Sequence, residues 1–138
     1  MEIVPYLTFQ GECQEAIDLY TKAFNSEIIE IMRFKDLTQN PNHPVKIDEH
    51  QKNWVVQCTL KIGDNFIRVS DSIKKPTKIE GERISIAVEC TPAEARKIFS
   101  KLSKEGTIGA LLQKTFFSPC YGLVTDKFGV NWVIIGQK

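Results

Sequence analysis

The stretch EAIDLYTKAF (residues 15–24) decides the fold, because a related stretch, EARKIFSKLS, returns at residues 94–103. A glutamate, an alanine, an apolar residue, an aromatic residue and a lysine recur in the two stretches at equal spacing. Apolar residues three and four positions apart are typical of a helix with one buried face, so each stretch predicts such a helix. An internal repeat of this kind indicates that the chain is built from two similar units.

The segments around the two predicted helices correspond as well. The first half has strand patterns at residues 3–9, 27–34, 54–62 and 66–69, with a helix at 13–24 between the first two. The second half has strand patterns at residues 83–90, 110–117, 121–125 and 130–135, with a helix that follows Thr91 and runs to about Lys104. Each half is therefore predicted as β-α-β-β-β.

These patterns predict an α+β fold in which two βαβββ modules form a curled mixed sheet around a cavity, with the helices on the outside. The length of 138 residues fits a single domain. We expect modules at about residues 1–72 and 83–138, joined by a lysine-containing linker at 73–82. Residues 35–53 are polar and contain two prolines, which is typical of a long loop.

Local signals support this division. Thr91 precedes a proline and has Glu94 three residues later, which predicts the capped start of a helix. The sequence Gly63-Asp64-Asn65 between two strand patterns predicts a hairpin. Asp126 and Gly129 are predicted to hold a turn, the first through its carboxylate and the second through its backbone freedom.

Composition and charge exclude some classes of protein. The formal net charge of +1 gives no basic surplus for a phosphate backbone, so we expect no nucleic-acid partner. The apolar runs are too short to span a bilayer and the first residues lack a signal-type pattern, so we expect no membrane partner and a cytoplasmic location. None of the four cysteines forms a C-x-x-C pair, which favours reduced structural thiols.

Four stretches, taken in order, resemble a known superfamily: PYLTFQGECQEAIDLYTKAF, LKIGDNFIRVSD, ISIAVEC and TDKFGVNW. Together they span nearly the whole chain, and the last is the most specific. The chain resembles the vicinal oxygen chelate superfamily, which includes glyoxalase I, bleomycin-resistance proteins and extradiol dioxygenases. Within it, the chain is similar to the PhnB-like branch, also described as demethylubiquinone methyltransferase-like. The resemblance implies two βαβββ modules, a small-molecule ligand and a homodimer, which would also cover open sheet edges.

The resemblance also implies positions for a metal, on the first and fourth strands of each module. These positions fall at Pro5 or Tyr6, near Arg68, at Arg83 or Ser85, and at Val133. Metal-binding members use His, Glu or Gln there, and proline, valine and arginine side chains do not ligate metals. We therefore expect no metal in the cavity. His43 and His50 in the polar loop leave a loop-borne metal site as an alternative.

No cofactor is expected either. A nucleotide-type cofactor such as S-adenosylmethionine needs a glycine-rich turn between a strand and a helix, and the sequence contains no such turn. Two βαβββ modules also offer no doubly wound sheet. The methyltransferase description of the branch therefore does not lead us to expect S-adenosylmethionine binding.

Strand alternation selects the residues that would line the cavity. If Val133 faces it, Asn131 and Ile135 do as well, while Trp132 and Ile134 pack beneath a helix. The candidate ligand-binding residues are Tyr6, Gln57, Arg68, Arg83, Ser85, Phe117, Asn131 and Val133, with Trp54 as a further one.

The two arginines in this set suit a carboxylate or phosphonate ligand. Alternatively, one or both lie at strand ends, either exposed or paired with Glu82, Glu89 or Asp71. Tyr6 is either a proton donor or a packed aromatic residue.

Three functions remain open at this point. The first is a small-molecule-binding protein of the glyoxalase or bleomycin-resistance type, without the superfamily's metal site and with an anionic ligand. The second is a metabolite-transforming enzyme of the same superfamily, such as a lyase, an isomerase or a dioxygenase-like enzyme, that is either metal-dependent or uses Tyr6, Arg68 or Cys58. The third is a regulatory or interaction module without chemistry. No Ser-His-Asp or Cys-His pattern supports the second.

Overall fold

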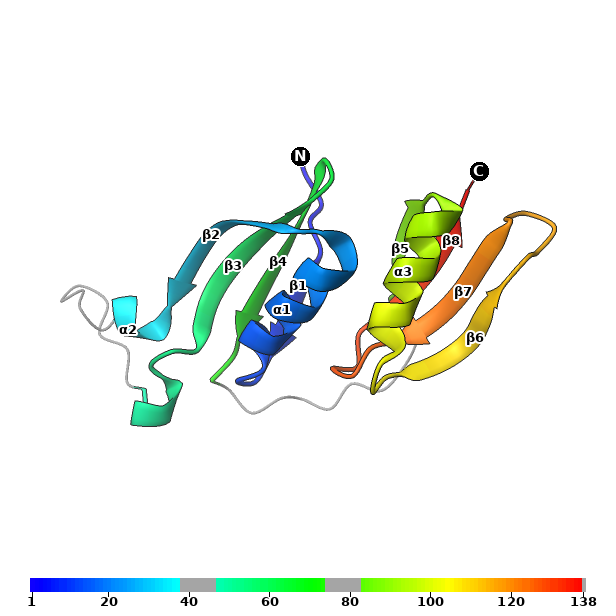
Figure 1. Ribbon diagram of the computed structural model, residues 1–138. Helices are drawn as coiled ribbons and strands as arrows, with labels where there is room; N and C mark the ends of the chain where they lie inside the picture. Colours follow the sequence, from blue (N-terminus) through cyan, green and yellow to red (C-terminus); the bar gives the residue numbers. More distant parts are fainter. Residues whose placement is uncertain (38–46, 74–82, 138) are drawn as a thin grey trace. The chain divides into compact units, whose positions relative to one another are not determined.

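A computed structural model describes residues 1–37, 47–73 and 83–137 (Figure 1). The strands are β1 (Tyr6–Phe9), β2 (Glu27–Arg33), β3 (Val55–Ile62), β4 (Asn65–Asp71), β5 (Ile86–Cys90), β6 (Thr107–Gln113), β7 (Cys120–Thr125) and β8 (Asn131–Gly136). The helices are α1 (Cys13–Phe24), the single turn α2 (Phe34–Leu37), the 3-10 helix η1 (Glu49–Gln51) and α3 (Pro92–Ser103).

The strands form two four-stranded mixed sheets with the same topology. The first has the order β1-β4-β3-β2 and the second the order β5-β8-β7-β6. In each, the first strand of the module runs parallel to the last and the other neighbours are antiparallel. The predicted α+β fold of two βαβββ modules is therefore confirmed. Each sheet belongs to its own compact unit.

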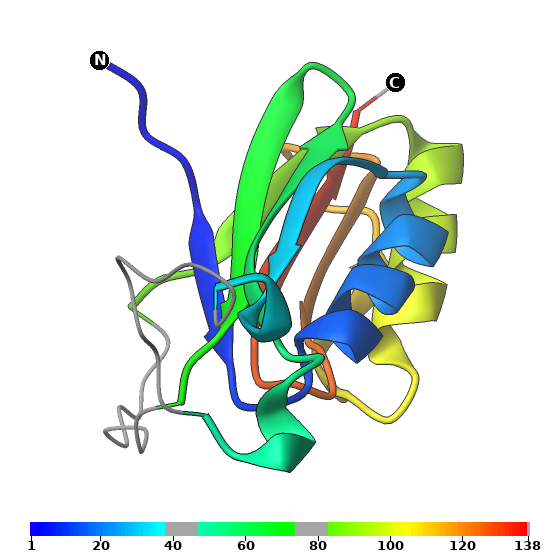
Figure 2. The same ribbon diagram turned by 90° about the vertical axis from the view of Figure 1, so that its left-hand side faces the viewer.

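A helix lies against one face of each sheet. Figure 2 shows α1 on one side of the first sheet, and α3 packs mainly on β7 and β8 of the second. The side chains that α1 buries are Cys13, Ala16, Ile17, Tyr20 and Ala23. Those that α3 buries are Ala95, Ile98, Phe99 and Leu102. The apolar residues that recur at helical spacing in the sequence repeat therefore form the buried face of each helix.

The two helices begin in different ways. The predicted cap of α3 is confirmed, because the Glu94 amide donates to Thr91 Oγ1 at 3.2 Å and the Thr91 amide donates to Glu94 Oε1 at 3.1 Å. These bonds from the amide and hydroxyl of Thr91 lower the pKa of Glu94. The residue before α1, Glu12, makes no side-chain capping bond. Another side chain must therefore secure the start of α1.

Asp71, at the end of β4, does so. Its Oδ1 atom accepts hydrogen bonds from the amides of Gly11, at 2.7 Å, and Cys13, at 3.0 Å. Its Oδ2 atom accepts a bond of 3.0 Å from the amide of Val55. Gly11 has a φ of +83°, and a Cβ there would lie 2.7 Å from Cζ2 of Trp54. One buried carboxylate thus joins the β1–α1 turn to β3 and β4.

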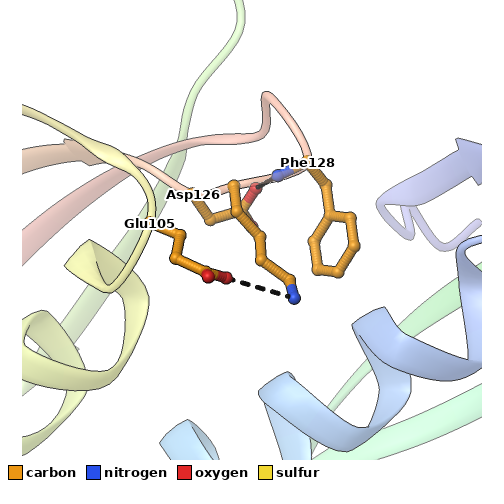
Figure 3. A network of polar contacts seen from close by, with 4 residues as sticks. Glu105, Asp126 and Phe128 are labelled. Atoms are coloured by element: carbon orange, nitrogen blue, oxygen red, sulfur yellow. Dashed lines mark hydrogen bonds and ion pairs between the residues drawn. The ribbon is translucent and has the colours of Figure 1, made fainter.

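A second carboxylate, Asp126, holds the turn between β7 and β8. Its Oδ1 atom accepts bonds from the amides of Phe128, at 2.9 Å, and Val130, at 3.1 Å, and its Oδ2 atom accepts one of 3.0 Å from Trp132 Nε1. Gly129 has a φ of +90°. The predicted roles of Asp126 and Gly129 are therefore confirmed. Figure 3 shows the contact between Asp126 and Phe128, together with the ion pair in which the Glu105 carboxylate lies 3.6 Å from the amine of Lys127.

Some predicted boundaries are wrong. The strand predicted at 110–117 is β6, which ends at Gln113, because the Thr115 amide donates to the Ser118 carbonyl at 2.8 Å and closes a turn. The strand predicted to start at residue 3 starts after Pro5, which has no amide proton for a ladder. The polar loop predicted at 35–53 includes most of α2 and all of η1. Asp36 in α2 accepts a bond from the Arg33 amide, and Asp48 forms a capping box with Gln51 at the start of η1.

Parts of the prediction lie outside the described residues. These parts are 38–46 of the polar loop, with His43, and 74–82 of the linker. The shared cavity, the module boundaries and the single domain stay predictions.

The junction between α3 and β6 provides the first testable prediction. Glu105 has a φ of +59°, a left-handed conformation in which a Cβ is unfavourable. Glu105→Gly is expected to raise the free energy of unfolding by about 0.5–1 kcal/mol, since the lost exposed contact with Lys127 is worth less. Urea unfolding measures the change. Lys104→Gly, at a φ of −62°, is the control and should lower stability. A less stable Glu105→Gly variant would contradict this account.

Candidate functional site

Each sheet has a helix-covered face and an opposite face, which we call the open face. On β4 of the first sheet, Ile67 and Val69 point toward the helix side and are 5% and 0% exposed. Arg68 lies between them and is exposed. Tyr6 on β1 is opposite Arg68 and is 53% exposed. The prediction that Arg68 faces away from the helix is therefore confirmed.

The register extends this pair into a row across the first sheet. Arg68 is paired with Tyr6 on β1 and with Thr59 on β3, and Thr59 is paired with Glu30 on β2. Paired residues on neighbouring strands project to the same side of a sheet. Tyr6, Arg68, Thr59 and Glu30 therefore share the open face, and we call them the Arg68 row. Within the described ranges, the side chains of Arg68 and Glu30 make no hydrogen bond or ion pair.

A second row runs beside it. Phe66 on β4 is paired with Lys61 on β3, and Lys61 is paired with Glu27 on β2. Glu27 and Glu30 are three residues apart, so a regular strand would place them on opposite faces. A register shift between Ile28 and Glu30 puts both on the open face. Both rows therefore carry a cation on an inner strand and a carboxylate on the edge strand.

The open face of the second sheet is more apolar. Val133 on β8 is paired with Leu123 on β7 and Ala87 on β5. Its neighbours Trp132 and Ile134 are 2% and 0% exposed, as the alternation predicts. At one end of this face the Thr125 hydroxyl lies 2.8 Å from Asn131 Oδ1.

Aromatic rings mark the other end of this face. Phe117 stands edge-on to Tyr121 with ring centroids 5.0 Å apart, and Phe116 stands edge-on to Phe117. Phe117 is 56% exposed. Ser118 anchors the turn, because its hydroxyl donates to the Gly136 carbonyl at 2.8 Å and accepts a bond from the Cys120 amide. The exposed rings therefore stand on a well-bonded turn.

The structure groups the predicted site residues by sheet. Tyr6 and Arg68 are paired, and Gln57 lies two positions from Thr59 on the same face. Asn131 and Val133 share the open face of the second sheet, and Phe117 lies beside Tyr121. Trp54, by contrast, packs on Gly11 and against His50.

Two other positions differ from the expected pattern. Arg83 and Ser85 precede β5 and are exposed. The residue opposite Val133 is Ala87, so the expectation that Arg83 or Ser85 occupies the first-strand position of the second module is wrong. Their part in ligand binding stays a prediction.

The sequence analysis did not include Thr59, Glu30 and Tyr121 among the candidate site residues. Thr59 could have been found, because it alternates with the buried residues Cys58 and Leu60.

Cys58, Cys90 and Cys120 lie on the helix side of their sheets, and Cys13 lies on the buried face of α1. Burial raises the pKa of the Cys58 thiol to about 11, and burial also raises the pKa of Cys13. Burial raises the pKa of Cys90 to about 11. Such thiols stay protonated at neutral pH and are poor nucleophiles. Cys58 is 0% exposed and faces away from Arg68, so it cannot act on a ligand held by that arginine.

The side chains at the positions where other superfamily members bind a metal do not suit a metal ion here. The paired positions are Tyr6 with Arg68 in the first module and Ala87 with Val133 in the second. An alanine and a valine offer no ligand atom, and a guanidinium repels a cation. In the part of the chain that the structure describes, no group of three or more His, Cys, Asp or Glu side chains could hold a metal ion.

The strand–helix turns do not suit a nucleotide-type methyl donor. Such donors bind where a turn between a strand and a helix leaves its backbone amides open to the ligand. At the β1–α1 turn, Asp71 already accepts bonds from the amides of Gly11 and Cys13. At the β5–α3 turn, the amide of Thr91 donates to the Glu94 side chain and the amide of Glu94 donates to the Thr91 side chain. The residues at both turns therefore do not fit S-adenosylmethionine.

These two mismatches give a prediction about the purified protein. S-adenosylmethionine is expected to leave the melting temperature unchanged, whereas a true ligand at saturating concentration would raise it by mass action. Elemental analysis is expected to find less than one zinc, nickel, manganese or iron ion per chain, and a chelator to leave the melting temperature unchanged. A stoichiometric metal whose removal lowers the melting temperature, or a shift of several degrees with S-adenosylmethionine, would contradict the prediction.

Comparison with known proteins gives consistent matches. A family model described as 3-demethylubiquinone-9 3-methyltransferase matches residues 1–135. Protein YjdN of Escherichia coli (strain K12) is 26% identical over 140 residues, which cover 97% of this chain and 94% of YjdN.

Solved structures agree with these matches. The structure of a putative 3-demethylubiquinone-9 3-methyltransferase, PhnB protein, from Bacillus cereus is 28% identical with a TM-score of 0.79, and the match covers 98% of both chains. The fosfomycin resistance protein FosX from Listeria monocytogenes is 9% identical with a TM-score of 0.68, covering 100% of this chain and 94% of FosX, and shows a likeness of fold. The chain therefore has the vicinal oxygen chelate fold of the glyoxalase and bleomycin-resistance type. No described helix is long and apolar enough to cross a membrane.

Proposed function

The chain belongs to the family described as 3-demethylubiquinone-9 3-methyltransferase, and we propose that this member binds a small anionic molecule and does not use a nucleotide-type methyl donor. The proposal rests mainly on Arg68. Its side chain is exposed on the open face of the first sheet, and Tyr6 lies opposite it. A guanidinium presents paired donors that match the oxygens of a carboxylate or phosphonate.

The surroundings of Arg68 support a ligand-binding role over a structural one. Asp71, the carboxylate on the same strand, is 4% exposed and bonds instead to the amides of Gly11, Cys13 and Val55. Gln57 and Thr59 on β3 add polar groups to the same face. These positions support the proposal that Arg68 binds an anion from solvent and that Gln57 and Thr59 orient it.

A second candidate function follows from Tyr6. Its phenol lies on the strand next to Arg68 in the same row, where a proton donor would reach an anion bound by the guanidinium. This supports the alternative of a metabolite-transforming enzyme. Turnover that is lost in Tyr6→Phe while ligand binding is kept would favour the enzyme, whereas binding without turnover favours the binding protein.

The proposal is tested with matched charged and neutral probes. Butyrate is expected to shift amide resonances near Arg68, and butyramide, which has nearly the same shape without the charge, is expected to bind more weakly. Equal binding of butyrate and butyramide would overturn the anionic-ligand proposal.

We further propose that the protein acts in the cytoplasm as a homodimer.

A further inference from the structure

The charges on the open face of the first sheet follow a repeated order. In the Arg68 row, the cation on β4 and the carboxylate of Glu30 on β2 are separated by Thr59 on β3. In the neighbouring row, Lys61 on β3 is directly opposite Glu27 on β2. Both rows therefore run from a positive side chain on an inner strand to a negative one on the edge strand.

These charges have no partners of their own among the residues described. The side chains of Arg68, Glu30, Lys61 and Glu27 take part in no hydrogen bond or ion pair there. Strands in a sheet lie about 4.8 Å apart, so the Cα atoms of Arg68 and Glu30 are roughly 10 Å apart across Thr59. Because no ion pair joins the side chains of Arg68 and Glu30, both charged ends are available to a short ligand.

The two carboxylates also limit the kind of anion that fits. A simple anion bound by Arg68 would lie close to Glu30 and would be repelled by it. A ligand that carries an ammonium group toward β2 would turn this repulsion into attraction. Charge-assisted hydrogen bonds at both ends are stronger than neutral ones, so both charges would contribute to affinity.

We propose that the Arg68 row binds a small zwitterion, in which Arg68 holds the oxyanion and Glu30 holds an ammonium group a few carbon atoms away. Tyr6 lies beside the oxyanion, and the Thr59 hydroxyl lies between the two charges. The inference rests on the proposed function, because it uses the same arginine. It adds the chemical class of the ligand, an amino acid or an aminophosphonate with separated charges.

The test compares 4-aminobutyrate with butyrate, which has the same carbon chain without the ammonium group. Ligands of this size bind with a Kd on the order of a millimolar, which a chemical-shift titration measures. Wild-type protein is expected to bind 4-aminobutyrate about tenfold more tightly than butyrate. Glu30→Gln is expected to remove this difference and leave butyrate binding unchanged or stronger. Glu12→Gln, a change of another exposed glutamate, is the matched control and should have no effect.

The outcomes separate the two proposals. If butyrate and 4-aminobutyrate bind equally to wild-type protein, or if Glu30→Gln does not change their ratio, the zwitterion inference is wrong and the anionic-ligand proposal stands. If neither probe binds in a way that depends on Arg68, both fail. Glycine and β-alanine extend the test, since affinity that rises with the number of carbons between the charges would support a ligand that spans Arg68 to Glu30.

Discussion

Replacing Arg68 by methionine is expected to weaken binding of an anionic ligand by about 10- to 150-fold, and to leave the fold intact. The loss corresponds to one charge-assisted interaction, roughly 1.5–3 kcal/mol. Methionine keeps a similar stem volume, and Arg68 is exposed, so the free energy of unfolding should change by less than about 0.5 kcal/mol. Calorimetry with the tightest-binding carboxylate from a metabolite screen measures the first effect, and urea unfolding measures the second.

Arg96→Met is the matched control for this experiment. Arg96 is exposed on α3 and does not belong to the Arg68 row, so its replacement removes the same charge from a different element. Ligand affinity should not change in this variant, which separates a local contact from a change in net charge. A structural role for Arg68 would give the opposite pattern, with lower stability and unchanged affinity. That result would rule out Arg68 as a ligand-binding residue.

Asp71→Ala is expected to cause the largest loss of stability of any single change proposed for this protein, about 3–5 kcal/mol. The substitution leaves the amides of Gly11, Cys13 and Val55 without their acceptor. Each buried amide without a partner costs roughly 1–3 kcal/mol. Urea unfolding followed by circular dichroism measures the loss. Stabilities of small domains are commonly about 5–15 kcal/mol, so a wild-type stability near the lower end would leave the variant partly unfolded.

Asp71→Asn keeps the experiment informative if the alanine variant does not fold. Its amide oxygen can still accept from Gly11 and Cys13, but its NH2 group faces the amide of Val55, so about half of the loss is expected. Asp64→Ala, in the exposed β3–β4 turn, is the control and should change little. A loss below about 1 kcal/mol in Asp71→Ala would show that water replaces the carboxylate without difficulty.

Much of the fold could be predicted because its signals are local. The bounds of α1 agree with the predicted helix at residues 13–24, since the apolar period and the following residue Asn25, in a left-handed conformation, define its end. The start of α3 is set by Thr91 and Glu94, which lie three residues apart. The direction of Arg68 follows from strict alternation with Ile67 and Val69. In each case a few neighbouring residues contain the information.

The remaining features depend on residues that are distant in the sequence. The side on which Glu30 lies depends on a register shift at Ile29, and a period of two read from the sequence places it on the wrong face. The identity of the residue opposite Val133 depends on the register between β5 and β8. The sequence alone does not distinguish registers that differ by two residues. The role of Asp71 depends on turns that it meets only in the folded chain. The candidate site was therefore predicted only in part.

The position of Asp71 also sets the order in which the chain can fold. Thr91 and Glu94 secure the first turn of α3 as soon as that short segment exists. The start of α1 has to wait, because its acceptor lies 60 residues beyond Gly11 and 58 beyond Cys13. During synthesis α1 leaves the ribosome before β4, yet the amides of Gly11 and Cys13 stay bonded to water until β4 has emerged and docked. The helix that is made first is thus completed only when its whole module has closed.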